Sequence, residues 1–129
     1  MEQPQYLIDT NAVIDYLGRK MSPSAMVFMD LVIDAVPHLS VVSKIEVLSF
    51  NAPEEHYELL TDFMADAVIY DLSENVIDQT IQLRKHHKTK LPDAIIAATA
   101  LVYDLTLISR NIADFRYITG LKLIDAHLL

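Results

Sequence analysis

The sequence predicts an α/β fold: a three-layer α/β/α sandwich whose central parallel sheet of four to five strands is flanked by helices. Short apolar runs alternate with segments of helical periodicity from one end of the chain to the other. This alternation is typical of parallel strands joined by helices that cover both faces of the sheet. The chain has 129 residues, 52% of them hydrophobic, which is enough to bury one core. We therefore expect a single domain over residues 1–129.

Two apolar runs and several helix signals organise the first half of the chain. Residues 5–9 and 38–42 have the length and composition of short buried strands. A helix is expected over residues 11–17, where a glycine follows it. Ser43 is expected to begin another helix that runs to about residue 50. Prolines mark the remaining helix boundaries, with Pro23 in a first turn, Pro37 after a helix end and Pro53 at a helix start.

The second half repeats the alternation of strands and helices. Ser73 is expected to cap a long helix that ends in the basic stretch 84–88. Pro92 begins a helix through residue 102 that is apolar almost all round, so this helix should be buried. A helical turn is expected over residues 111–115. The remaining apolar runs predict strands at 67–70, 105–108 and 121–124.

The composition excludes several classes of protein. No apolar run approaches the ~18–20 residues of a membrane span, and the first four residues lack the basic region of a secretory signal, so we expect a cytoplasmic protein. The chain has no cysteine, hence no disulfide or thiolate site, and its two glycines cannot form a glycine-rich phosphate loop. The net charge of -8 disfavours non-specific nucleic-acid binding unless a local basic patch overrides it.

Four acidic residues stand near predicted element ends, and three of them have an ordinary structural interpretation. Glu46 follows Ser43 by three residues, which is the spacing of a capping box. Asp93 lies in the first turn of a helix, where the macrodipole favours an anion, and Asp114 has a capping spacing from Asn111. Asp9 does not occupy the usual capping position before the first helix. A carboxylate at the end of a buried strand needs a partner.

Taken together, these acids predict a metal site. Residues that follow parallel strands lie along one edge of the sheet, so Asp9, Glu46 and Asp114 should converge there. Asp93 does not directly follow a strand, but the helix start that carries it should face the same edge. Crowded carboxylates would repel one another by several kcal/mol at low effective dielectric. A divalent cation between them would relieve this repulsion, and ligands that are all oxygen favour Mg²⁺ or Mn²⁺ over zinc. A water on such an ion can attack a phosphodiester.

Four segments in order also resemble a known family. These are Leu-Ile-Asp-Thr-Asn at 7–11, Ser-Lys-Ile-Glu at 43–46, Leu-Pro-Asp-Ala-Ile-Ile-Ala-Ala-Thr-Ala at 91–100, and Ser-Arg-Asn-x-x-Asp-Phe at 109–115. The chain is similar to PIN domains, and most of all to the VapC-type ribonuclease toxins of toxin–antitoxin pairs. The resemblance implies a PIN-like fold and a metal-dependent endoribonuclease. It also implies an RNA substrate, a cognate antitoxin protein, a homodimer and no membrane partner.

The resemblance assigns roles to individual residues. It implies catalytic acids at Asp9, Glu46, Asp93 and Asp114. The metal would be held by Asp9, Asp93 and Asp114, with supporting polar side chains at Asn11, Ser109 and Asn111. The family usually has threonine where Ser109 stands, and serine keeps the hydroxyl. Asn11 is also a plausible partner for a metal-bound water.

Basic residues near the proposed site are candidate phosphate contacts. They are Lys44, Arg84, Lys85, Lys88, Lys90 and Arg110. The alternative for the cluster 84–90 is a solvated helix end whose cations suit the macrodipole. Asp15 is expected to be exposed, and the histidines, including His127, to be ordinary surface or strand-end residues.

Two other functions are open to this sequence. A metal-dependent phosphatase of the haloacid-dehalogenase type also begins with an acid after its first strand, but it needs a second aspartate two residues later, where this chain has Asn11. A non-catalytic or regulatory PIN-like domain would be expected to lose one or more acids. All four are present here, so the nuclease is the favoured interpretation.

Overall fold

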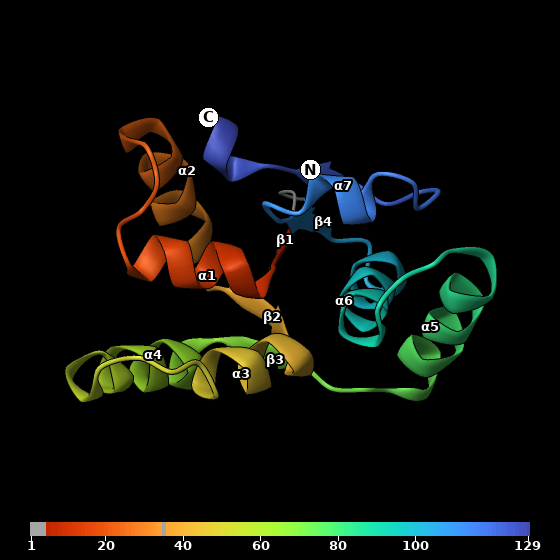
Figure 1. Ribbon diagram of the computed structural model, residues 1–129, viewed down its shortest axis with the longest axis horizontal. Coiled ribbons are helices and arrows are strands. Elements are labelled where there is room, and N and C mark those ends of the chain that lie inside the picture. The colour runs from red at the N-terminus through yellow and green to blue at the C-terminus, as the bar shows by residue number, and fades with distance from the viewer. Residues whose placement is uncertain (1–4, 35) are drawn as a thin grey trace.

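The computed structural model describes residues 5–34 and 36–129, and strands and helices alternate along them (Figure 1). The first half contains two strands and four helices. They are β1 (Tyr6–Ile8), α1 (Thr10–Leu17), α2 (Pro23–Asp34), β2 (His38–Ser40), α3 (Val41–Leu48) and α4 (Glu54–Asp66). The second half contains β3 (Val68–Tyr70), α5 (Glu74–His86), α6 (Leu91–Val102), β4 (Thr106–Ile108), α7 (Ile112–Phe115), β5 (Leu123–Ile124) and the 3₁₀ helix η1 (Ala126–Leu128).

All strand pairs in the described residues are parallel. One sheet has the order β1-β4-β5, and β2 pairs with β3 in a second ladder. β1 also lies against β2, which brings the two ladders together. In the β1–β4 register Ile8 faces Ile108, so the residues that follow these two strands are neighbours.

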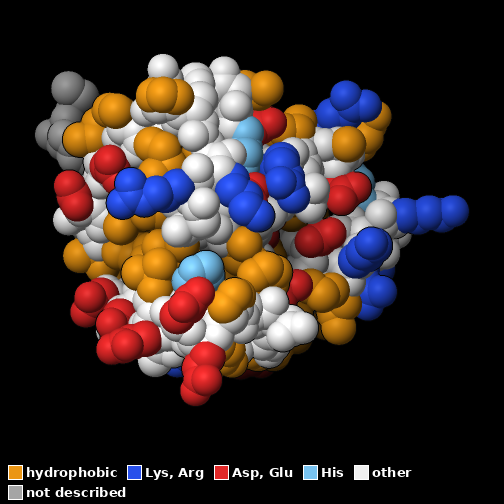
Figure 2. All heavy atoms as spheres, turned by 60° about the vertical axis from the view of Figure 1, so that its left-hand side comes forward, with side chains coloured by type: hydrophobic (Ala, Val, Ile, Leu, Met, Phe, Trp, Pro, Cys, Tyr) orange, Lys and Arg blue, Asp and Glu red, His pale blue; other side chains and the backbone are white. Residues whose placement is uncertain are grey.

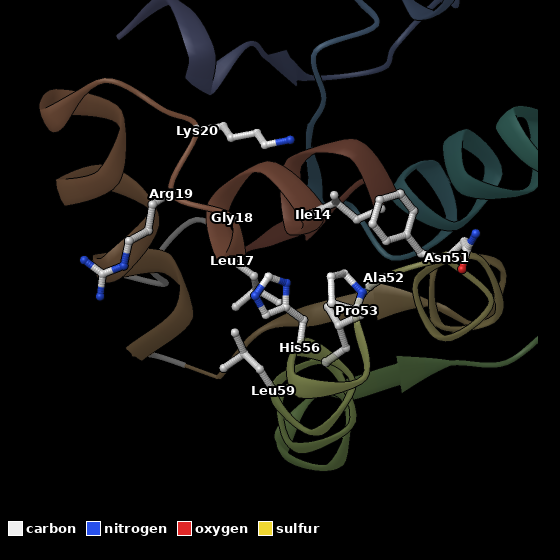
Figure 3. Close-up of a pocket in the computed structure, with 12 residues that line it drawn as sticks. Ile14, Leu17, Gly18, Arg19, Lys20, Asn51, Ala52, Pro53, His56 and Leu59 are labelled. Carbon is white, nitrogen blue, oxygen red and sulfur yellow. The ribbon is translucent and has the colours of Figure 1, made fainter.

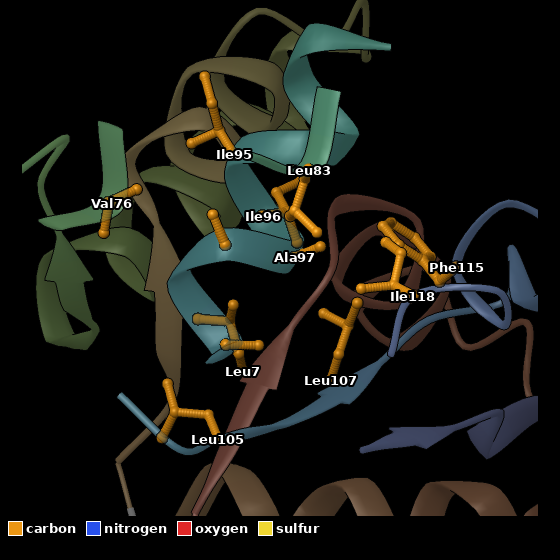
Figure 4. Packing of buried hydrophobic residues seen from close by; sticks show 12 residues of the cluster. Leu7, Val76, Leu83, Ile95, Ile96, Ala97, Leu105, Leu107, Phe115 and Ile118 are labelled. Atoms are coloured by element: carbon orange, nitrogen blue, oxygen red, sulfur yellow. The ribbon is translucent and has the colours of Figure 1, made fainter. Parts of the chain in front are cut away.

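Helices cover both faces of the strands, which confirms the predicted three-layer α/β/α architecture. Side chains alternate between faces along a strand, and the neighbours Leu7 and Ile8 accordingly belong to two different cores. Leu7 packs with residues of α5, α6 and α7, including Ile96 and Phe115 (Figure 4). Ile8 packs with residues of α1 to α4, including Met29. In Figure 1 the two groups of helices accordingly lie on opposite sides of β1 and β4.

Helix α6 is the most buried helix, as its sequence predicts. Every residue from 94 to 100 is buried, and small side chains such as Ala97 and Ala98 let α5 pack closely against it. Burial of each large apolar side chain contributes roughly 1.5–3 kcal/mol relative to exposure, so α6 anchors the half of the molecule that carries Asp93. Within the ranges 5–34 and 36–129, no helix is both long and apolar enough to cross a membrane.

Two predicted helix starts are wrong. β2 ends at Ser40 and α3 begins at Val41, because the Ser40 hydroxyl accepts a hydrogen bond from the Val42 amide and caps the helix. Ser43 is therefore a buried residue inside α3, and the proposed Ser43–Glu46 capping box does not form. Asp9 is itself the N-cap of α1, which starts at Thr10, and its carboxylate accepts from the Thr10 amide.

Candidate active site

The ends of β1 and β4 place Asp9 beside Ser109. The Asp9 amide donates to the Ile108 carbonyl at 2.9 Å, which continues the parallel ladder to the last residue of each strand. The Ser109 hydroxyl then donates to Asp9 Oδ2 at 2.7 Å. Both residues are buried, with Asp9 only 4% exposed. A hydrogen bond of this kind to a charged acceptor is stronger than a neutral one, so Ser109 fixes the orientation of the Asp9 carboxylate.

Further donors complete the surroundings of Asp9. The Thr10 amide donates to Oδ1 at 2.8 Å, and Asn11 Nδ2 donates to Oδ2 at 3.3 Å. The Asn111 amide donates to the Ser109 hydroxyl at 3.0 Å, so the turn after β4 supports the same cluster through its backbone. The structure thus brings Asn11 and Ser109 onto Asp9 by their side chains. Asn111 occupies the N-cap position of α7, but its side chain makes no capping bond there.

Glu46 approaches this edge from α3. Its side chain is exposed, and the Thr10 hydroxyl donates to Oε1 at 2.6 Å. Thr10 was not among the sequence-predicted site residues, although it stands between Asp9 and Asn11 in the recognised segment. The only local signal was its place in that segment, because the partner lies 36 residues away in the sequence.

Asp93 lies in the first turn of α6 and is half-buried. Burial raises the pKa of its carboxyl above the ordinary value, and the negative charges of Asp9, Asp114 and Glu46 raise it further. Lys90 acts in the opposite direction and lowers this pKa. The charges of the other three predicted acids therefore all act on Asp93.

Asp9 is also more difficult to ionise than an ordinary aspartic acid. Burial raises its pKa, while the hydrogen bonds from Ser109, Thr10 and Asn11 lower it and the charge of Glu46 raises it again. The net direction is upward. Three donors are therefore not enough to offset burial and repulsion, and an added positive charge would stabilise the ionised form.

Comparison with known proteins identifies the family. The family model of the PIN domain matches residues 6–128 of this chain. The chain belongs to the PIN domain family. This membership confirms the resemblance seen in the sequence, and it argues against the phosphatase of the haloacid-dehalogenase type. A comparison with curated proteins gave no match.

Several solved structures share this PIN fold over almost their whole length. A toxin–antitoxin complex from Klebsiella pneumoniae has a chain that is 31% identical, with a TM-score of 0.72, coverage of 95% of this chain and 98% of that one. One chain of DNA-bound VapBC from Salmonella typhimurium is 20% identical to this chain, with a TM-score of 0.81. The match covers 96% of this chain and 99% of that one. VapBC2 from Rickettsia felis, bound to a promoter DNA fragment, is 22% identical with a TM-score of 0.77 and coverage of 92% and 96%.

The donor chemistry of this PIN domain fits a hard divalent cation. Asp9, Asp93 and Asp114 supply only oxygen atoms, which Mg²⁺ and Mn²⁺ prefer. Among the described residues no three acidic or histidine side chains are already grouped closely enough to ligate one ion. Asp93 and Asp114 have no side-chain hydrogen bond in the described part of the chain, so these two carboxylates are free to turn toward an ion. The raised pKa values of Asp9 and Asp93 indicate the same need for positive charge.

The predicted phosphate contacts of the PIN domain lie in three different surroundings. Lys90 acts on the site, since its charge lowers the pKa of Asp93. The side chains of Lys44, Lys85 and Lys88 are exposed, and Arg84 Nε donates to the Thr89 carbonyl in the loop between α5 and α6. Arg110 is held differently, because its Nη1 lies 2.8 Å from Asp15 Oδ2.

Asp15 and His127 correct two expectations from the sequence. Asp15 is 8% exposed rather than solvated, and its Oδ2 accepts from Arg110 and also contacts His127 Nε2 at 2.8 Å. His127 belongs to η1 near the C-terminus and is largely shielded, with 16% of its side chain exposed. Neither contact has a local sequence signal, because 95 and 112 residues separate the partners.

A groove with many apolar lining residues lies away from the four acids. This groove of about 460 Å³ runs between α1 and the start of α4, and its lining includes Ile14, Leu17, Phe50 and Leu59 (Figure 3). Arg19, Lys20 and His56 also line it. Figure 2 shows Lys and Arg side chains across the middle of one face of the molecule, above a largely apolar area. The groove contains none of the predicted catalytic residues, so it is not the catalytic site.

Proposed function

We propose that this PIN domain is a Mg²⁺- or Mn²⁺-dependent endoribonuclease, and that it is the toxin of a type II toxin–antitoxin pair. The observation that carries this proposal is the edge of the sheet where Ser109 and Asn11 bind the buried Asp9 carboxylate and where Thr10 contacts both Asp9 and Glu46. The charges of Asp9, Asp114 and Glu46, which raise the pKa of Asp93 in addition to its burial, support it. Helix capping alone does not require that these carboxylates lie close enough for their charges to act on one another. Perturbed acids gathered at strand ends are typical of a functional site.

Asp9, Asp93 and Asp114 are the residues that would hold the metal ion. When bound, the ion would activate a water and stabilise the negative charge that develops on the phosphate. Ser109 and Asn11 hold the Asp9 carboxylate in place through Oδ2, at 2.7 and 3.3 Å. This support fixes one ligand before the ion arrives and lowers the cost of ordering the site.

Glu46 is suited to accept a proton from the attacking water. Thr10 binds only Oε1 of its carboxylate, and the side chain is exposed to solvent. The second oxygen, Oε2, remains available as a general base, which must reach the proton it removes within hydrogen-bond distance. Thr10 would act by keeping that oxygen in a fixed direction.

Basic residues beside Asp93 are the proposed RNA contacts. Lys90 is close enough to shift the pKa of Asp93, and Arg84, Lys85 and Lys88 lie in the preceding helix end and loop. Lys44 lies two residues before Glu46 on α3. Cations near the scissile phosphate would offset the repulsion between RNA and a chain of net charge -8. Arg110 is the weakest of these candidates, since Asp15 holds its guanidinium.

Protein partners follow from the toxin proposal. The similar structures are toxin–antitoxin or VapBC complexes. For this chain we propose a cognate antitoxin and a homodimer. The apolar groove between α1 and α4 and the exposed Val27 and Leu31 on α2 offer surface for such partners.

Expression in a bacterial host tests the toxin proposal. Induction of the chain alone should arrest growth, and co-expression with the protein of the adjacent gene should restore it. Asp9→Asn should also abolish the arrest, while Asp104→Asn, which removes an exposed partner of Lys122, should not. Growth arrest that persists with Asp9→Asn would contradict the proposal, and absence of arrest by the wild-type chain would favour the non-catalytic alternative.

A further inference from the structure

Asp15 is a buried carboxylate outside the four predicted site acids. It lies on α1, the helix that begins directly after Asp9. Arg110 Nη1 and His127 Nε2 both lie 2.8 Å from the same oxygen, Oδ2. Burial of a charged group is costly unless hydrogen bonds and opposite charges compensate it. The chain therefore uses two partners from distant segments to keep one charge inside the molecule.

Arg110 links this ion pair to the acidic site. Its backbone amide donates to Asn11 Oδ1 at 3.1 Å, and Asn11 Nδ2 donates to Asp9 Oδ2 at 3.3 Å. Arg110 is thus attached to α1 at both ends, by its backbone at Asn11 and by its guanidinium at Asp15. The residue before it, Ser109, makes the 2.7 Å bond to Asp9.

The C-terminal 3₁₀ helix supports the same carboxylate from the other side. Asp125 Oδ1 accepts from the His127 amide at 3.0 Å and lies 3.4 Å from Nδ1 of the imidazole. The backbone bond holds the start of η1 in place, while Nδ1 makes no hydrogen bond within the described residues. One connected set of residues therefore runs from His127 in η1 through Asp15 and Arg110 to Asn11 and Asp9, with the backbone amide of Arg110 as one link.

We propose that Asp15 is a positioning residue for the acidic site. By holding Arg110, it keeps the turn after β4 against α1, and this turn orients Asn11 and Ser109 on the Asp9 carboxylate. The expected change in the rate of RNA cleavage rests on the proposed nuclease function. The expected change in hydrogen exchange is measured on the metal-free protein and does not depend on that function. The same geometry gives the Arg110 guanidinium an ionic partner within the chain.

The test compares Asp15→Asn with Asp104→Asn, a control that removes the carboxylate of another 2.8 Å ion pair, exposed on the surface. Amide hydrogen exchange is measured by NMR on the metal-free proteins. We expect the Arg110 amide to exchange roughly tenfold faster in Asp15→Asn, because its bond to Asn11 opens locally. The Leu107 amide, bonded to the Lys122 carbonyl inside the sheet, should not change.

Mn²⁺ binding and RNA cleavage provide the functional readouts. Asp15→Asn should weaken Mn²⁺ binding, measured by calorimetry. It should also lower kcat roughly ten- to a hundredfold while KM changes little, because displaced catalytic groups slow the reaction without weakening substrate binding. Arg110→Lys and His127→Gln keep a donor to Asp15 and should retain most of the activity. Arg110→Met should reproduce the defect, and the double variant Asp15→Asn/Arg110→Met should be no worse than either single variant.

The outcomes separate this proposal from the proposed function. If Asp15→Asn does not fold, Arg110→Met carries the same test, because 56% of that side chain is exposed. Faster exchange at Arg110 in a protein that neither binds Mn²⁺ nor cleaves RNA would support the positioning role and contradict the nuclease. Unchanged hydrogen exchange at the Arg110 amide would overturn the positioning role. A double variant whose loss of activity equals the two single losses combined would overturn it as well.

Discussion

The Thr10 hydroxyl donates a 2.6 Å hydrogen bond to Oε1 of Glu46 and so connects the first turn of α1 to α3. Thr10 also supplies the amide that binds Asp9 Oδ1 at 2.8 Å. One residue therefore contacts two of the four predicted acids, with its backbone on one and its side chain on the other. This arrangement makes the position of Glu46 relative to Asp9 dependent on a single hydroxyl group.

Replacement of that hydroxyl should slow catalysis without unfolding the protein. Thr10→Val keeps the shape of the side chain and the bond from its amide to Asp9, but it releases Glu46. We expect kcat for RNA cleavage to fall about tenfold, as loss of a positioned general base would do in part, and the melting temperature to change little because the bond is exposed. Thr10→Ser should retain the rate. Equal rates for Thr10→Val and wild type would exclude the proposed role of Thr10.

Removal of the Ser109 hydroxyl should destabilise the metal-free protein. Ser109→Ala leaves a buried carboxylate without its shortest side-chain donor, and loss of a hydrogen bond to a buried charged group costs roughly 1.5–3 kcal/mol. Because that donor lowers the pKa of Asp9, its loss should raise this pKa further. The free energy of unfolding, measured with urea, should therefore decrease more at pH 7 than at pH 4. Ser109→Thr keeps the hydroxyl and serves as the matched variant.

The charge of Asp93 should destabilise the metal-free fold at neutral pH. Its pKa is raised in the folded state, so the folded protein binds the proton more tightly than the unfolded chain does. The resulting penalty is absent below the ordinary pKa of aspartic acid and fully present above the raised value. Asp93→Asn should thus melt a few degrees higher than wild type at pH 7, with the difference shrinking as the pH falls through 4.

A divalent cation should reverse that order of stability. Mn²⁺ stabilises whichever protein binds it in the folded state, so it should raise the melting temperature of wild type more than that of Asp93→Asn. Calorimetric scans with and without Mn²⁺ measure both effects. An Asp93→Asn variant that melts lower than wild type in metal-free buffer at pH 7 would mean that Asp93 serves chiefly as a helix cap.

The basic stretch before α6 should contribute to RNA affinity through its charge. Lys85→Gln/Lys88→Gln removes two exposed cations, so it should weaken binding and reduce the slope of log affinity against log salt by about 1–2. Filter binding to an RNA oligonucleotide over a range of salt concentrations measures this slope. Lys122→Gln, at an exposed ion pair with Asp104, is the control. An unchanged slope would favour a solvated helix end over an RNA contact.

Features that depend on local pattern could be predicted from the sequence. The apolar runs located each strand to within a few residues, and the parallel arrangement follows from their alternation with helices. The strand order was not predicted; the structure pairs β1 with β4 and so places Asp9 and Ser109 side by side. Convergence of the acids was inferred from the same edge rule.

Features that depend on a choice between equivalent residues, or on distant contacts, could not be predicted. Ser40 and Ser43 can both cap a helix, and only the end of β2 at Ser40 decides between them. The burial of Asp15 depends on Arg110 and on His127, which is 112 residues away. Nothing in the residues around Asp15 indicates either partner, so an aspartate on a short helix was expected to be solvated.

Cleavage of RNA under single-turnover conditions is the decisive assay for the proposed metal-dependent nuclease. A fluorescent RNA should be cleaved by wild type in Mn²⁺ or Mg²⁺ and should remain intact in EDTA. Asp93→Asn should cleave at least a hundredfold more slowly, as removal of a group that acts in the transition state does, while Asp104→Asn keeps the wild-type rate. Cleavage by Asp93→Asn at the wild-type rate, or cleavage that persists in EDTA, would contradict a metal site held by Asp9, Asp93 and Asp114.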